Sequence, residues 1–280
     1  MFDTILLTTD GSDLATAACE QGIELAKKFG STLHVLYAAG IPEDASWHQA
    51  DEEWRKRGYD VVDPIVSRAS DRGLEVRASV KAGRPLMEIL EFAGNEEVEL
   101  ITCGTHGRTG IRKLISGSVA SGVIRDSTVP VLSVSGKATD VPREIDTILL
   151  AVDGRMGTRS AVTHAIQMAT VLNADVHALS VVNPASTSVS SVLDAFEDVA
   201  ENAVEEVESR GSNRDIPVTT AVEHGEPHHT IVTYAESEDA DLIVMGTESR
   251  SGLDRLVFGS CSQRVVSRAP RPVLTVRSID

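Results

Sequence analysis

The chain contains the same pattern twice, and this internal repeat constrains the fold more than any other feature of the sequence. Four segments of the first half return in the same order in the second half: residues 2–11 as 145–154, 82–85 as 224–227, 104–118 as 246–260, and 129–132 as 271–274. The first match is the most direct, since FDTILLTTDG becomes IDTILLAVDG. The offset is 143 residues at the start and 142 later, so a single deletion relates the copies over nearly their whole length, which indicates a duplicated domain.

The two copies are expected to be separate domains at residues 1–136 and 145–280. A length of 280 residues suits about two domains of ordinary size. Between the copies, residues 137–144 (KATDVPRE) are polar, include Pro142 and show no hydrophobic period. This stretch therefore has the composition of a short linker.

Each copy alternates short apolar runs with helical patterns. In the first copy, strands are expected at residues 4–8, 32–37, 74–80, 100–103 and 129–134. Helices are expected at residues 13–29, from Pro85 and from about Ser118. A further helical segment, with a break near Pro64, is expected between the second and third strands. Short β-branched runs without alternation are typical of strands buried on both faces. The pattern predicts an α/β fold with a parallel sheet and helices on both faces, but it leaves the strand order open.

Composition excludes several classes of function. The net charge of −16 argues against a general nucleic-acid binder, which needs basic patches. No apolar run is long enough for a membrane span, and the first residues lack a signal-peptide pattern, so we expect a cytoplasmic protein. Three widely spaced cysteines, Cys19, Cys103 and Cys261, indicate reduced thiols and not a structural zinc site.

A glycine-rich segment follows the fourth expected strand of the first copy. Gly104 and Gly107 are followed nine residues later by Gly117 and Ser118. Glycines let backbone N–H groups approach phosphate oxygens, and the amino end of the helix that starts at Ser118 favours an anion. Glycines that only form turns are the alternative. The segment is neither a Walker loop nor a G-x-G-x-x-G motif.

These features together resemble the universal stress protein domain over nearly all of each copy, so that the whole chain resembles a tandem universal stress protein. The ATP-binding branch of that family has the spacing Gly-x2-Gly-x9-Gly-Ser/Thr, which the first copy matches. The resemblance implies a five-stranded, doubly wound parallel sheet in the order 3-2-1-4-5. Ligands of such sheets bind at the switch point, here between strands one and four.

The resemblance also implies roles for individual residues. Asp10 would lie beside the ribose and help to hold a divalent ion, Mg²⁺ or Mn²⁺. Ala38 would offer backbone groups to the adenine, and the glycine segment would bind the phosphates of ATP. The nucleotide-binding residues expected in the first copy are Asp10, Ala38, Cys103, Gly104, Gly107, Arg108, Gly117, Ser118 and Val119.

The second copy departs from the family pattern at the loop. Ser249 replaces the second glycine, and Glu248 places a carboxylate beside the expected phosphates. The residues that still match are Asp153, Val181, Gly246, Gly259 and Ser260. We therefore expect unequal sites, with ATP bound mainly by the first copy.

Other polar and aromatic groups have simpler interpretations. His224, His228 and His229 are expected at a solvated helix start and not as metal ligands, and His106 fits an ordinary loop position. Arg108 could compensate phosphate charge or equally be an ordinary surface residue. Trp47, His48 and Trp54 are expected to pack a lid or a partner surface. The acidic segment 197–208 is expected to be a solvated amphipathic helix.

The resemblance, together with the glycine segment, thus implies an ATP-binding regulatory protein of the stress response. The alternatives are an interaction protein of the same fold that needs no nucleotide, and a slow ATPase, for which no residue is clearly placed as a base. The last strands of the two copies are expected to be sheet edges that pair within one chain as a pseudo-dimer, and a homodimer is also compatible with such edges.

Overall fold

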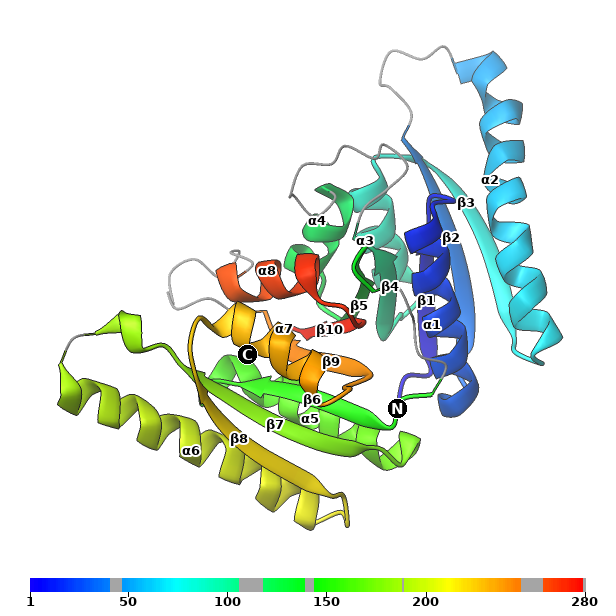
Figure 1. The fold of residues 1–280 in the computed structure, drawn as a ribbon. Coiled ribbons are helices and arrows are strands. Elements are labelled where there is room, and N and C mark those ends of the chain that lie inside the picture. Colours follow the sequence, from blue (N-terminus) through cyan, green and yellow to red (C-terminus); the bar gives the residue numbers. More distant parts are fainter. Residues whose placement is uncertain (41–46, 106–117, 139–143, 188, 248–258, 279–280) are drawn as a thin grey trace. The chain divides into compact units, whose positions relative to one another are not determined.

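The computed structural model describes residues 1–40, 47–105, 118–138, 144–187, 189–247 and 259–278 (Figure 1). The chain divides into two compact units, Met1–Val134 and Ser135–Asp280, called here the first and the second unit. Among the described residues, no helix is both long enough and apolar enough to cross a membrane.

The first unit is a five-stranded sheet in which every pairing is parallel. Its elements are β1 (Thr4–Thr9), α1 (Asp13–Phe29), β2 (Thr32–Gly40), α2 (Trp47–Asp71), β3 (Val76–Gly83), α3 (Pro85–Asn95), β4 (Leu100–Gly104), α4 (Ser118–Asp126) and β5 (Val131–Val134). The strand order β3-β2-β1-β4-β5 confirms the predicted order 3-2-1-4-5. The connections after β1 and after β4 therefore run in opposite directions, which makes the β1/β4 boundary the switch point.

The second unit repeats this topology. Its elements are β6 (Thr147–Val152), α5 (Met156–Leu172), β7 (Asp175–Val182), the short 3-10 helix η1 (Pro184–Ser186), α6 (Ser190–Ser212), β8 (Val218–His224), α7 (Pro227–Ser237), β9 (Leu242–Gly246), α8 (Ser260–Arg268) and β10 (Val273–Val276). The order β8-β7-β6-β9-β10 places β6 and β9 at the equivalent switch point.

The central strands are apolar because helices cover both of their faces. Ile5, Leu6 and Leu7 of β1 are fully buried, although neighbouring side chains point to opposite faces of the sheet. The helix that follows begins and ends as its sequence predicts: Ser12 caps α1, and Gly30 ends it in the left-handed conformation, at φ 73°.

The predicted break at Pro64 is wrong, because α2 is continuous from Trp47 to Asp71. Pro64 lies on the exposed side of the helix, where water can satisfy the carbonyl that the missing N–H leaves unpaired. On the opposite side Val62, Ile65 and Ala69 are almost fully buried, and their packing holds the helix across the proline.

Candidate functional site

The candidate site lies at the carboxyl ends of β1 and β4, which are parallel neighbours in the sheet. Leu7 of β1 is level with Thr102 of β4, so two residues further on the strands end together at Thr9 and Gly104. Thr9 is in turn level with Tyr37 of β2. Asp10 therefore follows the end of β1 beside Gly104. Ala38 is still within β2, paired with Lys81 of β3, and lies one residue beyond the level of Thr9 on the other side of β1.

The carboxylate of Asp10 is fixed by the turn that leads into α1. Its Oδ1 accepts the N–H of Ser12 (3.0 Å), and the Ser12 hydroxyl accepts the N–H of Ala15 (3.3 Å). Gly11 makes the turn possible because its φ of +79° lies in the left-handed region. The half-buried Asp10 side chain is thus held at the amino end of a helix.

Gly104 borders the same turn and has no room for a side chain. A Cβ at this position would lie 2.7 Å from the backbone N of Ala15 and 2.8 Å from the carbonyl carbon of Leu14. The end of β4 therefore packs directly against the first turn of α1. The preceding residue, Cys103, is fully buried, and burial raises the pKa of its thiol to about 12, so this thiol is protonated at neutral pH.

The glycine-rich segment expected to bind phosphates is described at its two ends. Gly104 ends β4, and α4 begins at Ser118, followed by the half-buried Val119. The first N–H groups of a helix have no partner within it and form a positive end that favours anions. Gly107, Arg108 and Gly117 lie outside the described residues.

Helix α2 forms a wall beside the Asp10 turn. A Cβ on Gly11 would lie 3.1 Å from Cγ2 of Val61, so α2 packs against the residue that follows Asp10. Further toward its amino end, Gly58 lets α2 approach the sheet closely, because a Cβ there would lie 2.4 Å from Cγ1 of Val80. Trp54, expected on a lid or partner surface, is half-buried on this helix.

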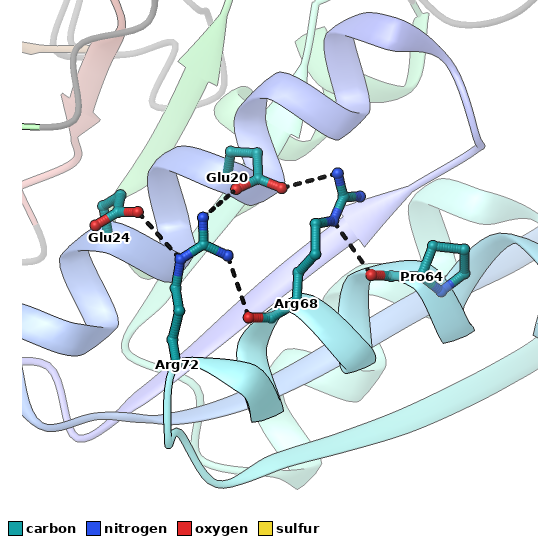
Figure 2. Close-up of polar contacts among 5 residues, drawn as sticks. All are labelled: Glu20, Glu24, Pro64, Arg68 and Arg72. Carbon is teal, nitrogen blue, oxygen red and sulfur yellow. Dashed lines mark hydrogen bonds and ion pairs between the residues drawn. The ribbon is translucent and has the colours of Figure 1, made fainter.

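An ionic cluster fixes the carboxyl half of α2 to α1 (Figure 2). The guanidinium of Arg68 lies 2.9 Å from Oε1 of Glu20, and that of Arg72 lies 3.2 Å from Oε2 of the same side chain. Arg72 also lies 3.3 Å from Oε1 of Glu24. The Nε of Arg68 donates to the carbonyl of Pro64 (3.2 Å), and Arg72 donates to that of Arg68 (3.1 Å). The cluster joins the wall to the helix whose amino end holds Asp10.

The second unit has the same turn with a different neighbour for the carboxylate. Oδ1 of Asp153 accepts the N–H of Arg155 (3.1 Å), and the guanidinium of Arg155 lies 3.5 Å from Oδ2. Val181 is level with Asp153, because Val152 pairs with Ser180 one residue earlier in each strand. Gly246 packs against α5 as Gly104 packs against α1, since a Cβ there would lie 2.8 Å from the carbonyl oxygen of Gly157.

Cys261, in the first turn of α8, lies near enough to the Asp153 carboxylate to interact with it electrostatically. The N–H of Gly259 donates to the carbonyl of Thr247 (3.1 Å) and joins the two ends of the segment between them. Ser260 is exposed, whereas the next residue, Cys261, is half-buried. Burial, and after it the nearby carboxylate of Asp153, raises the pKa of the Cys261 thiol to about 11. Glu248 and Ser249 lie outside the described residues.

The expectation of a solvated histidine cluster is wrong for His228. Its side chain is buried between α7 and α8, where Arg268 donates to Nε2 (3.0 Å) and Nδ1 lies 3.2 Å from Glu226. Arg264 also binds Glu226, at 2.7 Å. Because an arginine only donates, Nε2 accepts and the ring is neutral. Among the described residues, no group of three or more His, Cys, Asp or Glu side chains is arranged to hold a metal ion.

A sequence model described as the universal stress protein family matches residues 1–135 and 144–277. The chain belongs to the universal stress protein family. Both units are covered, in agreement with the resemblance noted from the glycine spacing and the opening strand.

Individual relatives agree with this assignment. A universal stress protein of Methanocaldococcus jannaschii is 31% identical over 140 residues, which cover 48% of this chain and 82% of the relative. A universal stress protein of Mycobacterium tuberculosis is 25% identical over 98% of this chain and 96% of its own length. The solved structure of a universal stress protein from Archaeoglobus fulgidus covers 99% of this chain and 97% of its own, with a TM-score of 0.78 at 23% identity, and so shares the fold.

Proposed function

We propose that this universal stress protein is an ATP-binding regulator that holds its nucleotide mainly in the first unit. The observation that supports this most directly is that Asp10 and Gly104 lie side by side at the switch point, where ligands of open α/β sheets bind, with Ala38 on the neighbouring strand β2 just beyond the level of the end of β1. The glycine spacing of the ATP-binding branch, from Gly104 to Ser118, starts at this same place.

The residues present fit a nucleotide. Backbone groups at Ala38, beyond the level of β1, suit the edge of an adenine ring, and the Asp10 carboxylate suits a ribose hydroxyl or a Mg²⁺ or Mn²⁺ ion that accompanies the phosphates. The absent side chain at Gly104 and the amino end of α4 suit phosphate oxygens. Binding would then change the surface that the first unit offers to partners.

The second unit supports a weaker site. Ser249 replaces the second glycine of the motif, and Glu248 adds a negative charge. Asp153 is in addition engaged by Arg155, which competes with a divalent ion for the same carboxylate. We infer that this unit binds ATP weakly or serves another role.

Equivalent substitutions in the two units test the proposal in the full-length protein. Asp10→Ala should weaken ATP binding by about tenfold or more in isothermal titration calorimetry. Asp153→Ala is the matched control, because it removes the same group from the equivalent turn, and it should change the affinity by less than about twofold. Equal effects of the two substitutions would contradict unequal sites.

Two further measurements separate the proposal from its alternatives. Nucleotide that copurifies and is released on denaturation would distinguish a nucleotide binder from a protein that acts through interactions alone. Phosphate release above the level of an Asp10→Ala control would indicate a slow ATPase. The pairing of β5 with β10 within one chain, and a homodimer, remain predictions that sedimentation of the separate units and of the full chain would test.

A further inference from the structure

Helix α6 is longer than the part of the sheet that it covers. It has 23 residues, a length of about 35 Å, whereas β7 and β8 have 8 and 7 residues and span about 25 Å. The carboxyl half of α6 packs on the sheet through Ala200, Ala203, Val204 and Val207. Its amino half extends past the carboxyl ends of the strands (Figure 1).

The apolar face of α6 continues along this overhang and stays exposed. Val192, Phe196 and Val199 follow one another at intervals of four and three residues, the spacing of one helix face, and Val189 is the extended residue that immediately precedes the helix. Their exposed fractions are 53%, 39%, 39% and 49%. They are four of the seven exposed large hydrophobic residues in the described part of the chain, and the other three lie on separate helices. We call these four side chains the overhang stripe.

Contacts within the second unit hold the overhang in place. Val199, at the inner end of the stripe, packs on the Asp153 turn, because a Cβ on Gly154 would lie 2.9 Å from its Cγ1. Glu197 lies 2.8 Å from Nε2 of His224 at the end of β8. The stripe is therefore a fixed surface at the mouth of the second unit's site.

The charge around the stripe has one sign. Between Ser190 and Ser209 the helix has seven Asp and Glu residues and no Lys or Arg. Asp194, Asp198 and Glu201 are exposed on the overhang itself. A second copy of this chain, with its net charge of −16, would bring mostly like charge to this surface.

We propose that the overhang stripe is the docking surface for an amphipathic helical segment of a partner protein, with apolar side chains at three- and four-residue spacing and Lys or Arg beside them. Burial of the four apolar groups supplies the driving force, and the carboxylates select basic partners and speed their approach. The surface belongs to the second unit and does not depend on nucleotide in the first.

A model peptide tests this without knowledge of the natural partner. The probe is an amphipathic Leu/Lys helix of about 18 residues, titrated into the full-length protein without nucleotide, with a scrambled peptide of the same composition as control. Val192→Ser combined with Phe196→Ser should weaken binding by about tenfold, and Met87→Ser combined with Val171→Ser, at exposed apolar sites elsewhere, by less than about twofold. Circular dichroism verifies that each variant is folded.

Charge reversal provides a gain of function. The variant with Asp194→Lys and Asp198→Lys should no longer bind the Leu/Lys peptide. It should instead bind a Leu/Glu peptide that the natural protein does not bind. Hydrogen exchange should show protection of residues 189–203 by the Leu/Lys peptide. Equal affinity for the scrambled peptide, or no effect of the stripe substitutions, would overturn the proposal. Self-association of the natural protein that Phe196→Ser abolishes would also overturn it, in favour of a second copy as the occupant.

Discussion

In the second unit the guanidinium of Arg155 lies 3.5 Å from the carboxylate of Asp153. At the equivalent position of the first unit stands Ser12, whose hydroxyl instead caps α1. Two turns of nearly identical sequence thus give their carboxylates different neighbours, one a helix cap and the other a cation. The cation that Arg155 provides thus has a serine in its place in the first unit.

Arg155→Ser should therefore make the second unit more like the first. In an Asp10→Ala background, which isolates the second site, we expect Mg²⁺–ATP to bind at least about threefold more tightly, because Asp153 becomes available to the ion. Stability should change by less than about 1 kcal/mol, since the pair is half exposed. Titration calorimetry measures the affinity, and Arg159→Ser, one turn further along α5, is the control. Weaker binding would show instead that Arg155 itself contacts the phosphates.

Glycine substitutions should separate packing from binding. Gly104→Ala places a Cβ 2.7 Å from backbone and should cost about 1–3 kcal/mol and weaken ATP binding. Gly246→Ala places a Cβ 2.8 Å from the carbonyl oxygen of Gly157 and should destabilise the second unit to a similar extent. It should not change the affinity of the first unit for ATP. Gly94→Ala, within α3 and with open space around it, should stabilise by about 0.5 kcal/mol. Urea unfolding and ATP titration of the three variants provide the comparison.

Stability should fall as the pH drops below about 6.5. Burial lowers the pKa of His228 and of His34, which packs edge-on against Phe92. As the pH falls, these histidines take up protons in the unfolded chain before they do so in the folded protein. Their contribution to the free energy of unfolding is therefore complete above the pKa of the unfolded state and is lost as the pH falls toward the pKa of the folded state. Each group contributes a slope of at most about 1.4 kcal/mol per pH unit.

The variant His228→Gln identifies the source of this slope. Glutamine keeps an acceptor for Arg268 but does not titrate, so the dependence of urea stability on pH between 7.5 and 5 should become shallower, with the remainder due to His34. An unchanged slope would show that protonation of His228 is not coupled to unfolding. Sequence alone did not reveal the burial of this side chain, because Arg268, which donates to it, follows forty positions later on another helix.

The fold was largely predictable because local signals agree with one another. The bounds of α1 follow from a cap, an apolar face and a terminal glycine, and the meeting of Asp10 with Gly104 follows from the strand order. What sequence could not supply depends on packing across elements. The continuity of α2 through Pro64 rests on burial of the opposite side of that helix, and the exposed stripe on α6 arises from the length of the helix relative to its sheet.

The ionic cluster between α1 and α2 should support the wall beside Asp10. Glu20→Gln removes the charge that both Arg68 and Arg72 contact and leaves two guanidinium groups close together. Because these side chains are 30–40% exposed, solvent screens them, and we expect a loss of about 1 kcal/mol for the first unit. The loss should shrink in 1 M salt, where screening acts over about 3 Å.

The more exposed ion pair between Glu75 and Arg77 provides the control for this cluster. Its side chains are 62% and 64% exposed, so Glu75→Gln should change stability by less than about 0.5 kcal/mol at any salt concentration. If α2 supports the site as its contact with Gly11 indicates, Glu20→Gln should also weaken ATP binding by about two- to threefold, whereas Glu75→Gln should not. A Glu20→Gln protein with lowered stability but unchanged ATP affinity would show that the wall is structural only and that the Asp10 turn holds its geometry without it.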